Sequence, residues 1–218
     1  MNKITTILFD FDGTIMDTRE VVLLSWQHTF MTLEGKERDP DEIYKTFGEP
    51  LKYTMARFFP GTKAEAALQI YRSYQKDNFA GKIKVFPGMK ELLEEIKKNG
   101  YHTALVTSRL KCTALEGIAQ HGLTSYFDEL VTCDDTEKHK PDPEPILAAL
   151  RKLGRRPEEA LMIGDTMFDI QCAKNARVQS VLVNWSESVS EEEKNGAKGP
   201  DFMIEKPMDL MDLLKALA

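Results

Sequence analysis

The chain has 218 residues, of which 42% are hydrophobic and 29% charged, and its formal net charge is −6 at pH 7. These values are ordinary for a globular protein with a sizeable core, and the acidic balance offers no basic surface of the kind that binds nucleic acid. No apolar run approaches the ~18 residues that a membrane-spanning helix needs, and no signal-peptide pattern precedes the first predicted strand. Three widely spaced cysteines form no metal-binding pattern, which favours free thiols and a cytoplasmic location.

A short apolar run at residues 7–9 predicts a buried strand that leads directly into Asp10-Phe11-Asp12-Gly13-Thr14. Because residues i and i+2 of an extended backbone point the same way, Asp10 and Asp12 are expected to face one cavity. Gly13 permits a sharp turn and brings backbone N–H groups close to a bound molecule. An ordinary Asp-rich turn is the alternative, but paired carboxylates at the end of a buried strand are typical of a catalytic or cation-binding site.

The next stretch, residues 18–82, shows no strand pattern and predicts a helical insertion. Asp17 and Thr18 are expected to cap its first helix, whose apolar face would carry Val21, Leu24, His28 and Met31. The expected helices cover residues 19–33, a segment starting at 39–40, 51–59 and 64–79.

From residue 86 onward, short strands alternate with helices. Helices are expected at 89–99, 110–121, 145–153, 168–176 and 208–217, and strands at 103–106, 130–132, 160–163, 181–183 and 202–204. This alternation predicts an α/β fold with a doubly wound parallel sheet, interrupted by the all-helical insertion. The expected core comprises residues 1–17 and 83–218, with the insertion at 18–82. Ligands of such sheets bind beyond the carboxyl ends of the strands.

Polar residues follow two further strands of the predicted core. Thr107 and Ser108 could hold phosphate oxygens through hydroxyl and N–H groups, although they could equally cap the next helix. Lys140 lies in a loop before a helix, where Pro141 and Pro143 stiffen the backbone, and on its own it is typical of solvated surface.

A second acidic pair, Asp165 and Asp169, follows the buried strand at 160–163. Asp165 is expected at the strand end and Asp169 on the first helical turn, so the two could present oxygens to one cation; an N-cap and a surface residue are the alternative. Since the candidate ligands are all oxygens, with no His or Cys cluster, Mg²⁺ is favoured over zinc.

Taken together, these stretches resemble, in order, the four motifs of the haloacid dehalogenase-like (HAD) phosphohydrolases. Thr107 matches its motif well, whereas Ser108 and Arg109 match less sharply. The resemblance covers nearly the whole chain, and residues 18–82 correspond in place to the helical cap of one branch of the family. It implies a Rossmann-like core. The motifs are Asp10-Phe11-Asp12-Gly13-Thr14, Val106-Thr107-Ser108, Lys140-Pro141-Asp142-Pro143 and Gly164-Asp165-Thr166-Met167-Phe168-Asp169.

The resemblance also implies roles for the acidic residues. Asp10 would be the nucleophile that forms a phosphoaspartyl intermediate. Asp12 would protonate the leaving group and then activate water, while its backbone carbonyl helps to bind Mg²⁺. Asp165 would be a direct metal ligand and Asp169 a direct or water-mediated one. An acid at position 12 argues against the dehalogenase branch, which lacks it.

The positive and polar residues are assigned in the same way. Lys140 would contact both the phosphate and Asp10 and neutralise charge in the transition state. The phosphate would be bound by Thr107, Ser108 and Gly13.

The substrate follows least directly from the sequence. Gly48-Glu49-Pro50-Leu51 resembles the cap loop of phosphoglycolate phosphatases and HAD-type inorganic pyrophosphatases, and the stretches at 140–145 and 200–203 look more like the pyrophosphatases. Near this loop, Lys52 and Arg19 suit a compact anion, so we expect inorganic pyrophosphate slightly ahead of 2-phosphoglycolate. The alternatives are a sugar phosphomutase of the β-phosphoglucomutase type and a catalytically idle binding protein with the same fold.

Overall fold

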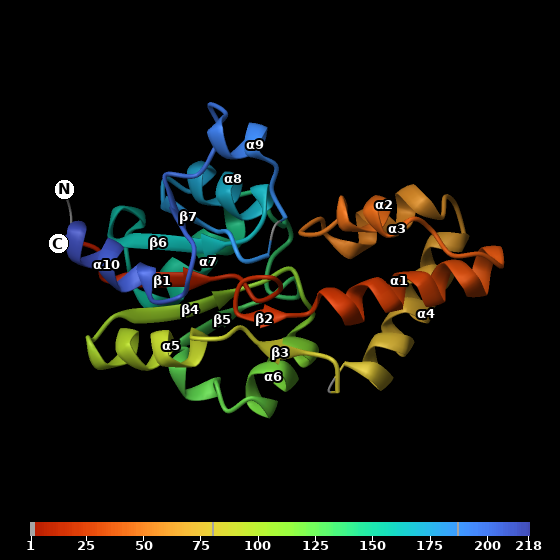
Figure 1. The fold of residues 1–218 in the computed structure, drawn as a ribbon, viewed down its shortest axis with the longest axis horizontal. Helices are drawn as coiled ribbons and strands as arrows, with labels where there is room; N and C mark the ends of the chain where they lie inside the picture. The colour runs from red at the N-terminus through yellow and green to blue at the C-terminus, as the bar shows by residue number, and fades with distance from the viewer. Residues whose placement is uncertain (1–2, 80, 187) are drawn as a thin grey trace.

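A six-stranded parallel sheet forms the larger part of the protein in the computed structural model, which describes residues 3–79, 81–186 and 188–218. The strand order is β5-β4-β1-β6-β7-β8, and the first and last strands of the chain, β1 and β8, both lie in this sheet (Figure 1). This confirms the predicted doubly wound α/β fold. The strands are β1 Thr6–Phe9, β4 His102–Val106, β5 Glu129–Val131, β6 Ala160–Gly164, β7 Gln179–Val183 and β8 Phe202–Ile204.

Helices cover both faces of the sheet, because successive apolar side chains of β1 point to opposite faces and each face must be shielded from water. Ile7 and Phe9 point into one apolar cluster and Leu8 into the other, so both sides of this central strand are buried. The first cluster includes residues of α5 (Met89–Lys98), α6 (Lys111–Gln120) and α10 (Asp209–Ala216). The second includes residues of α7 (Glu144–Leu153) and α8 (Met167–Asn175). The short helices are η1 Thr124–Tyr126, η2 Pro157–Glu159 and α9 Glu191–Asn195.

The register of β1 decides where the site forms. Phe9, its last residue, lies opposite Leu105 of β4 on one side and Ile163 of β6 on the other. The three strands therefore end at the same level, and Asp10 continues the ladder by donating its N–H to the Ile163 carbonyl at 2.9 Å. The residues that follow these strands emerge side by side at one edge of the sheet.

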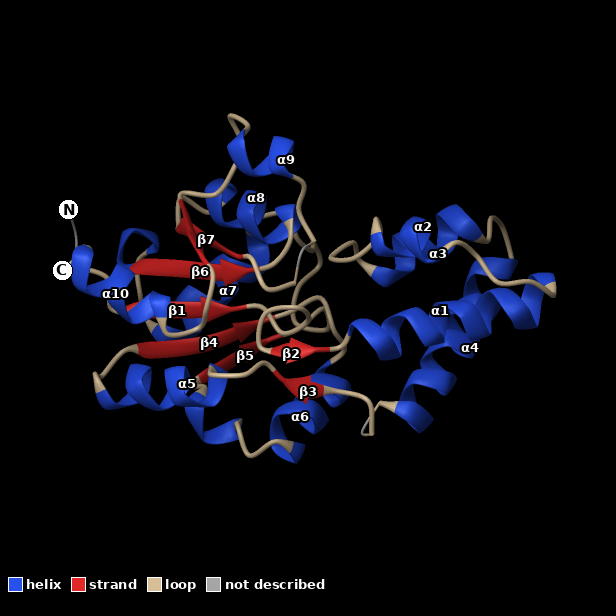
Figure 2. Cartoon of the chain, viewed as in Figure 1, coloured by secondary structure: helices blue, strands red, loops and turns tan. Residues whose placement is uncertain are grey.

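A helical lobe, consisting of α1 to α4, projects beyond this edge (Figure 2). Its helices pack around a core of their own, in which Trp26 lies 5.3 Å from Tyr71 and 5.8 Å from Phe30 between ring centroids. A short antiparallel pair, β2 (Met16–Asp17) and β3 (Lys84–Val85), joins the lobe to the sheet. The lobe helices are α1 Arg19–Glu34, α2 Pro40–Tyr44, α3 Leu51–Phe58 and α4 Lys63–Asn78.

The helix α1 begins at Arg19 as predicted, but the predicted capping by Thr18 needs correction. Thr18 precedes the helix, but its side chain makes no capping hydrogen bond and instead donates to Asp12 Oδ1 at 2.6 Å. Asp17 Oδ1 accepts the N–H of Arg19 at 3.2 Å. The hydroxyl that appeared to be a local cap is therefore used for a contact with the sheet edge.

The predicted apolar face of α1 is also wrong, because Val21 is buried whereas His28 and Met31 are exposed and Leu24 is half-buried. The buried face contains polar residues whose hydroxyls donate to carbonyls of their own helix, as Thr29 does to Ser25 at 2.7 Å. Hydrophobic periodicity cannot detect such residues. The buried face is Val21, Ser25, Trp26, Thr29 and Phe30.

Candidate active site

The residues singled out in the sequence follow four neighbouring strands. Asp10 follows β1, Thr107 follows β4, Lys140 lies between β5 and α7, and Asp165 follows β6. Asp169 joins them from the first turn of α8. The predicted placement beyond the carboxyl ends of the strands is confirmed.

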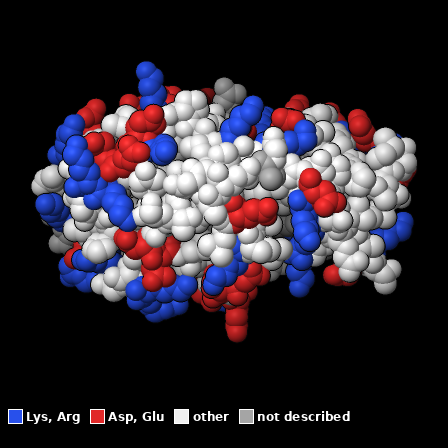
Figure 3. Space-filling view, turned by 90° about the horizontal axis from the view of Figure 1, so that it is seen from below, with Lys and Arg blue, Asp and Glu red and all other residues white. Residues whose placement is uncertain are grey.

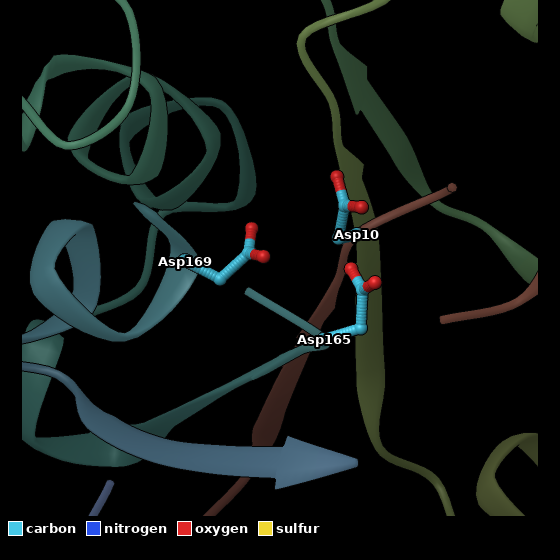
Figure 4. A group of neighbouring side chains, drawn as sticks. All are labelled: Asp10, Asp165 and Asp169. Carbon is cyan, nitrogen blue, oxygen red and sulfur yellow. The ribbon is translucent and has the colours of Figure 1, made fainter. Parts of the chain in front are cut away.

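Three of these carboxylates form one buried cluster. Asp10, Asp165 and Asp169 are 7%, 4% and 2% exposed, and each offers an oxygen within 4.8 Å of the others (Figure 4). Asp169 Oδ2 accepts hydrogen bonds from the N–H and hydroxyl of Thr166 at 3.1 and 2.7 Å. This capping arrangement fixes the Asp169 carboxylate at the start of α8.

Lys140 is buried against the acidic cluster. Its Nζ donates to Asp10 Oδ1 at 2.7 Å, Asp169 Oδ1 at 2.6 Å and the Val106 carbonyl at 2.7 Å. These contacts use all three donors of the ammonium group. With 4% of its surface exposed, Lys140 is not the solvated residue that its local sequence alone indicates.

The cluster carries more negative than positive charge. Burial raises the pKa of Asp10 well above its usual value, although Lys140 lowers it, and burial with the Asp169 charge raises the pKa of Asp165 to about 7. Burial opposes the charged form of Lys140, but Asp10 and Asp169 outweigh this and raise its pKa. For the two aspartates burial is the largest cause and neighbouring carboxylates add to it, so the single ammonium of Lys140 does not balance the negative charge of the cluster. A cation bound here would neutralise the excess.

Asp165 is held between two loops. Gly13 has a φ of +70°, and a Cβ atom there would lie 2.1 Å from Asp165 Oδ2, so only glycine fits. From the loop after β7, the hydroxyls of Ser186 and Ser188 donate to the same oxygen at 2.7 and 3.0 Å. No local pattern indicates a role for these serines, because their segment resembles an ordinary polar surface loop.

Asp12 is not a member of this acidic cluster. Its oxygens accept hydrogen bonds from Arg109 Nε at 2.8 and 2.9 Å and from Thr18 at 2.6 Å. Sequence reasoning gave Arg109 no role. Thr107 is buried and its Oγ1 accepts the Arg109 N–H at 3.1 Å, while Ser108 is half-buried at the same turn.

The helical lobe reaches this edge of the sheet. At Gly48, which has a φ of +83°, a Cβ atom would lie 2.7 Å from Thr166 Oγ1. A cavity of about 530 Å³ lies beside this contact, lined by Glu49, Pro50 and Tyr53 of the lobe and by Lys140 among the residues of the sheet part. The face seen in Figure 3 carries interspersed charges of both signs.

Comparison with known proteins identifies the family. The model of the haloacid dehalogenase-like hydrolases matches residues 7–183. This chain belongs to that family. The resemblance noted from the motifs is thereby confirmed, and the protein is an enzyme of the HAD hydrolase family.

Among its relatives, the HAD hydrolase is 34% identical over 214 residues to the pyrophosphatase PpaX of Bacillus velezensis, covering 97% of this chain and 96% of the relative. A protein of Caldanaerobacter subterraneus, provisionally named pyrophosphatase PpaX, is 41% identical over 213 residues, and the alignment covers 98% of this chain and 96% of the relative. A crystal structure from Lactobacillus plantarum, provisionally named a phosphoglycolate phosphatase, superimposes with a TM-score of 0.87 at 25% identity, covering 97% and 100%. In the described part of this HAD hydrolase, none of the helices combines the length and apolarity needed to cross a bilayer.

Proposed function

We propose that the protein is a Mg²⁺-dependent phosphatase of small anionic phosphates, with inorganic pyrophosphate preferred over 2-phosphoglycolate. The observation that carries this proposal is the buried cluster in which Lys140 contacts Asp10 and Asp169 while Asp165 lies within reach of the same point. A charged cluster of this kind is costly to bury unless it binds a ligand.

The donor set fits Mg²⁺. The oxygens of Asp10, Asp165 and Asp169 converge within 4.8 Å, Mg²⁺ prefers oxygen ligands, and the cluster has an excess of negative charge. Asp12 would add its backbone carbonyl, and Asp169 would bind directly or through water. When bound, Mg²⁺ would neutralise charge on the phosphoryl group during its transfer.

The chain's own residues would divide the reaction into two displacements. An oxygen of Asp10 attacks phosphorus, the bond to the leaving-group oxygen breaks, and Asp12 gives that oxygen a proton. Asp12 then takes a proton from water, whose oxygen attacks phosphorus and releases Asp10 and phosphate. Lys140 offsets the charge that develops beside Asp10.

The phosphate-binding groups remain as the motifs predict. The hydroxyl groups of Thr107 and Ser108 and the Ser108 N–H would hold the phosphate oxygens beside Gly13, whereas the N–H groups of Thr107 and Gly13 donate to the Val131 and Met16 carbonyls. The helical lobe would act as a cap that limits the access of water. We propose the division into a core of 1–17 and 83–218 and a cap of 18–82; residues 1, 2, 80 and 187 of these ranges lie outside the described part.

The substrate preference has two supports. The relatives named pyrophosphatase align over nearly the whole chain, and the lobe loop that touches Thr166 contains Gly48, a residue with no side chain to recognise a sugar or base. The expectations of a cytoplasmic enzyme without a nucleic-acid partner stay predictions.

The test is a comparison of kcat/KM for inorganic pyrophosphate, 2-phosphoglycolate, glucose 1-phosphate, glucose 6-phosphate and a mononucleotide, with Mg²⁺ and with EDTA. We expect the two compact anions to lead and EDTA to abolish turnover. A sugar phosphate or nucleotide that exceeds both anions tenfold, ~1.4 kcal/mol in transition-state binding, would contradict the proposed preference. Isomerisation of a sugar phosphate that depends on a sugar 1,6-bisphosphate would instead identify a phosphomutase.

A further inference from the structure

Arg109, whose side chain is 8% exposed, forms an ion pair with Asp12 from a position 97 residues away in the chain. We propose that Arg109 is a positioning residue for Asp12: it fixes the orientation in which Asp12 meets the leaving group, and it is itself anchored by the last helix of the lobe. This inference rests on the proposed function, since it takes Asp12 as the acid–base group.

The contacts of Asp12 leave its carboxylate little freedom. The side chain is 36% exposed, and a carboxylate so accessible would ordinarily turn between rotamers. Here Arg109 Nε lies 2.9 Å from Oδ1 and 2.8 Å from Oδ2, and the Thr18 hydroxyl donates to Oδ1 at 2.6 Å. Hydrogen bonds to an ionised acceptor are short and directional, so these three contacts select one orientation.

Arg109 is in turn held from two sides. Its guanidinium carbon lies 4.4 Å from the ring centroid of Phe79 and 5.4 Å from that of Phe11. Its Nη1 donates to Gln75 Oε1 at 3.4 Å, and the amide of Gln75 donates to the Tyr71 hydroxyl at 3.3 Å.

Most of these anchors belong to the lobe. Gln75 lies on α4, and Phe79 is the residue at its C-terminal end, whereas Phe11 lies beside Asp12 itself. The orientation of the Asp12 carboxylate therefore depends on the position of α4 relative to the sheet edge. Lysine could replace the charge at position 109, but it lacks the planar group that stacks on Phe79 and donates to Asp12 and Gln75 together.

A leaving-group comparison isolates this role. Phenyl phosphate and p-nitrophenyl phosphate have nearly the same shape, but phenolate is the poorer leaving group and needs protonation more. Since kcat/KM reports the steps up to the first irreversible one, it measures formation of the phosphoaspartyl enzyme. We expect Arg109→Gln to lower kcat/KM for phenyl phosphate about tenfold more than for p-nitrophenyl phosphate, within the range of general acid catalysis.

The double variant supplies a second readout. If Arg109 acts through Asp12, then Asp12→Asn combined with Arg109→Gln should be no slower than Asp12→Asn alone, within about threefold. The matched control is Arg156→Gln, which removes an exposed arginine that pairs with Glu159 and should leave both substrates unchanged. Gln75→Leu removes the hydrogen bond from Arg109 to α4 while keeping Arg109 and its contact with Phe79. This variant should show the same selective loss in weaker form, and it replaces Arg109→Gln if that variant does not fold.

Two results would overturn the inference. The first is an equal loss of kcat/KM for the two aryl phosphates in Arg109→Gln, or in Gln75→Leu if that variant replaces it. The second is a double variant in which the losses of the two single variants multiply. Failure of the proposed function gives a different result: Asp10→Asn would retain turnover, or Asp12→Asn would itself fail to discriminate between the two substrates.

Discussion

Gly48 of the helical lobe lies against the side chain of Thr166, the residue that joins Asp165 to the start of α8. A Cβ atom at position 48 would come within 2.7 Å of Thr166 Oγ1 and 2.8 Å of its Cγ2. Thr166 also donates to Asp169. The lobe thus touches the residue that orients part of the acidic cluster.

Gly48→Ala should therefore impair catalysis more than it impairs folding. Gly35→Ala is a matched control, because both glycines have left-handed φ values, +83° and +71°, but Gly35 has nothing within 4 Å of the added methyl group. Each variant should lose roughly 1–2 kcal/mol of unfolding free energy from backbone strain. Only Gly48→Ala should also lower kcat/KM, on the order of 10- to 100-fold. Equal kcat/KM in the two variants would show that the contact with Thr166 has no catalytic importance.

Asp10→Asn should fold normally and lose essentially all activity, because the amide cannot act as the nucleophile. During turnover, the wild-type enzyme quenched in acid should carry one phosphoryl group on Asp10, detectable by mass spectrometry. Appreciable turnover by Asp10→Asn, once deamidation has been excluded by the same measurement, would rule out this residue as the nucleophile.

Asp12→Asn and Asp165→Ala should fail in different ways. The Asp12 carboxylate contacts Arg109 and Thr18, so its loss should leave Mg²⁺ affinity intact while the rate falls on the order of 10²–10⁴-fold. Asp165→Ala removes an oxygen of the cluster and should weaken Mg²⁺ binding by more than about tenfold, with partial rescue at high Mg²⁺. Calorimetric titration distinguishes the two, and equal Mg²⁺ affinity in wild type and Asp165→Ala would exclude Asp165 as a ligand.

Thiol reagents should label one cysteine of the native protein near neutral pH. Cys112 is exposed, whereas burial raises the pKa of Cys133 to about 11 and that of Cys172 to about 12. Below those values both remain thiols rather than the reactive thiolates. Mass spectrometry should locate the fast label on Cys112, and Cys112→Ser should abolish it. Rapid native labelling of that variant would contradict the raised pKa values of Cys133 and Cys172.

Much of the fold could be predicted from local sequence because the signals are local. The apolar run before Asp10 and the matching one before Asp165 mark β1 and β6, and the family motifs place Lys140 beside them. Strand periodicity and strand-end position are properties of neighbouring residues, so they can be read without knowing the partners.

The contacts that complete the site could not be predicted in this way. Arg109 reaches Asp12 across 97 residues, and Ser186 reaches Asp165 across 21 residues from a segment with no regular pattern. Thr18 was mistaken for a helix cap because the same hydroxyl chemistry serves both purposes. The strands β2 and β3 have two residues each, too few to show a period of two.

The pairing of Met16 with Val85 has a consequence for how this enzyme can diverge. The chain leaves the sheet part and returns to it at adjacent points, so the residues between form an insertion whose two ends are joined by backbone hydrogen bonds. Lengthening, shortening or exchanging such an insertion costs little loop-closure entropy and leaves the strand register of the six-stranded sheet unchanged. Selection for a new substrate can therefore act on one contiguous stretch of the gene, while the stretches that encode the nucleophile and its neighbours remain under separate constraint.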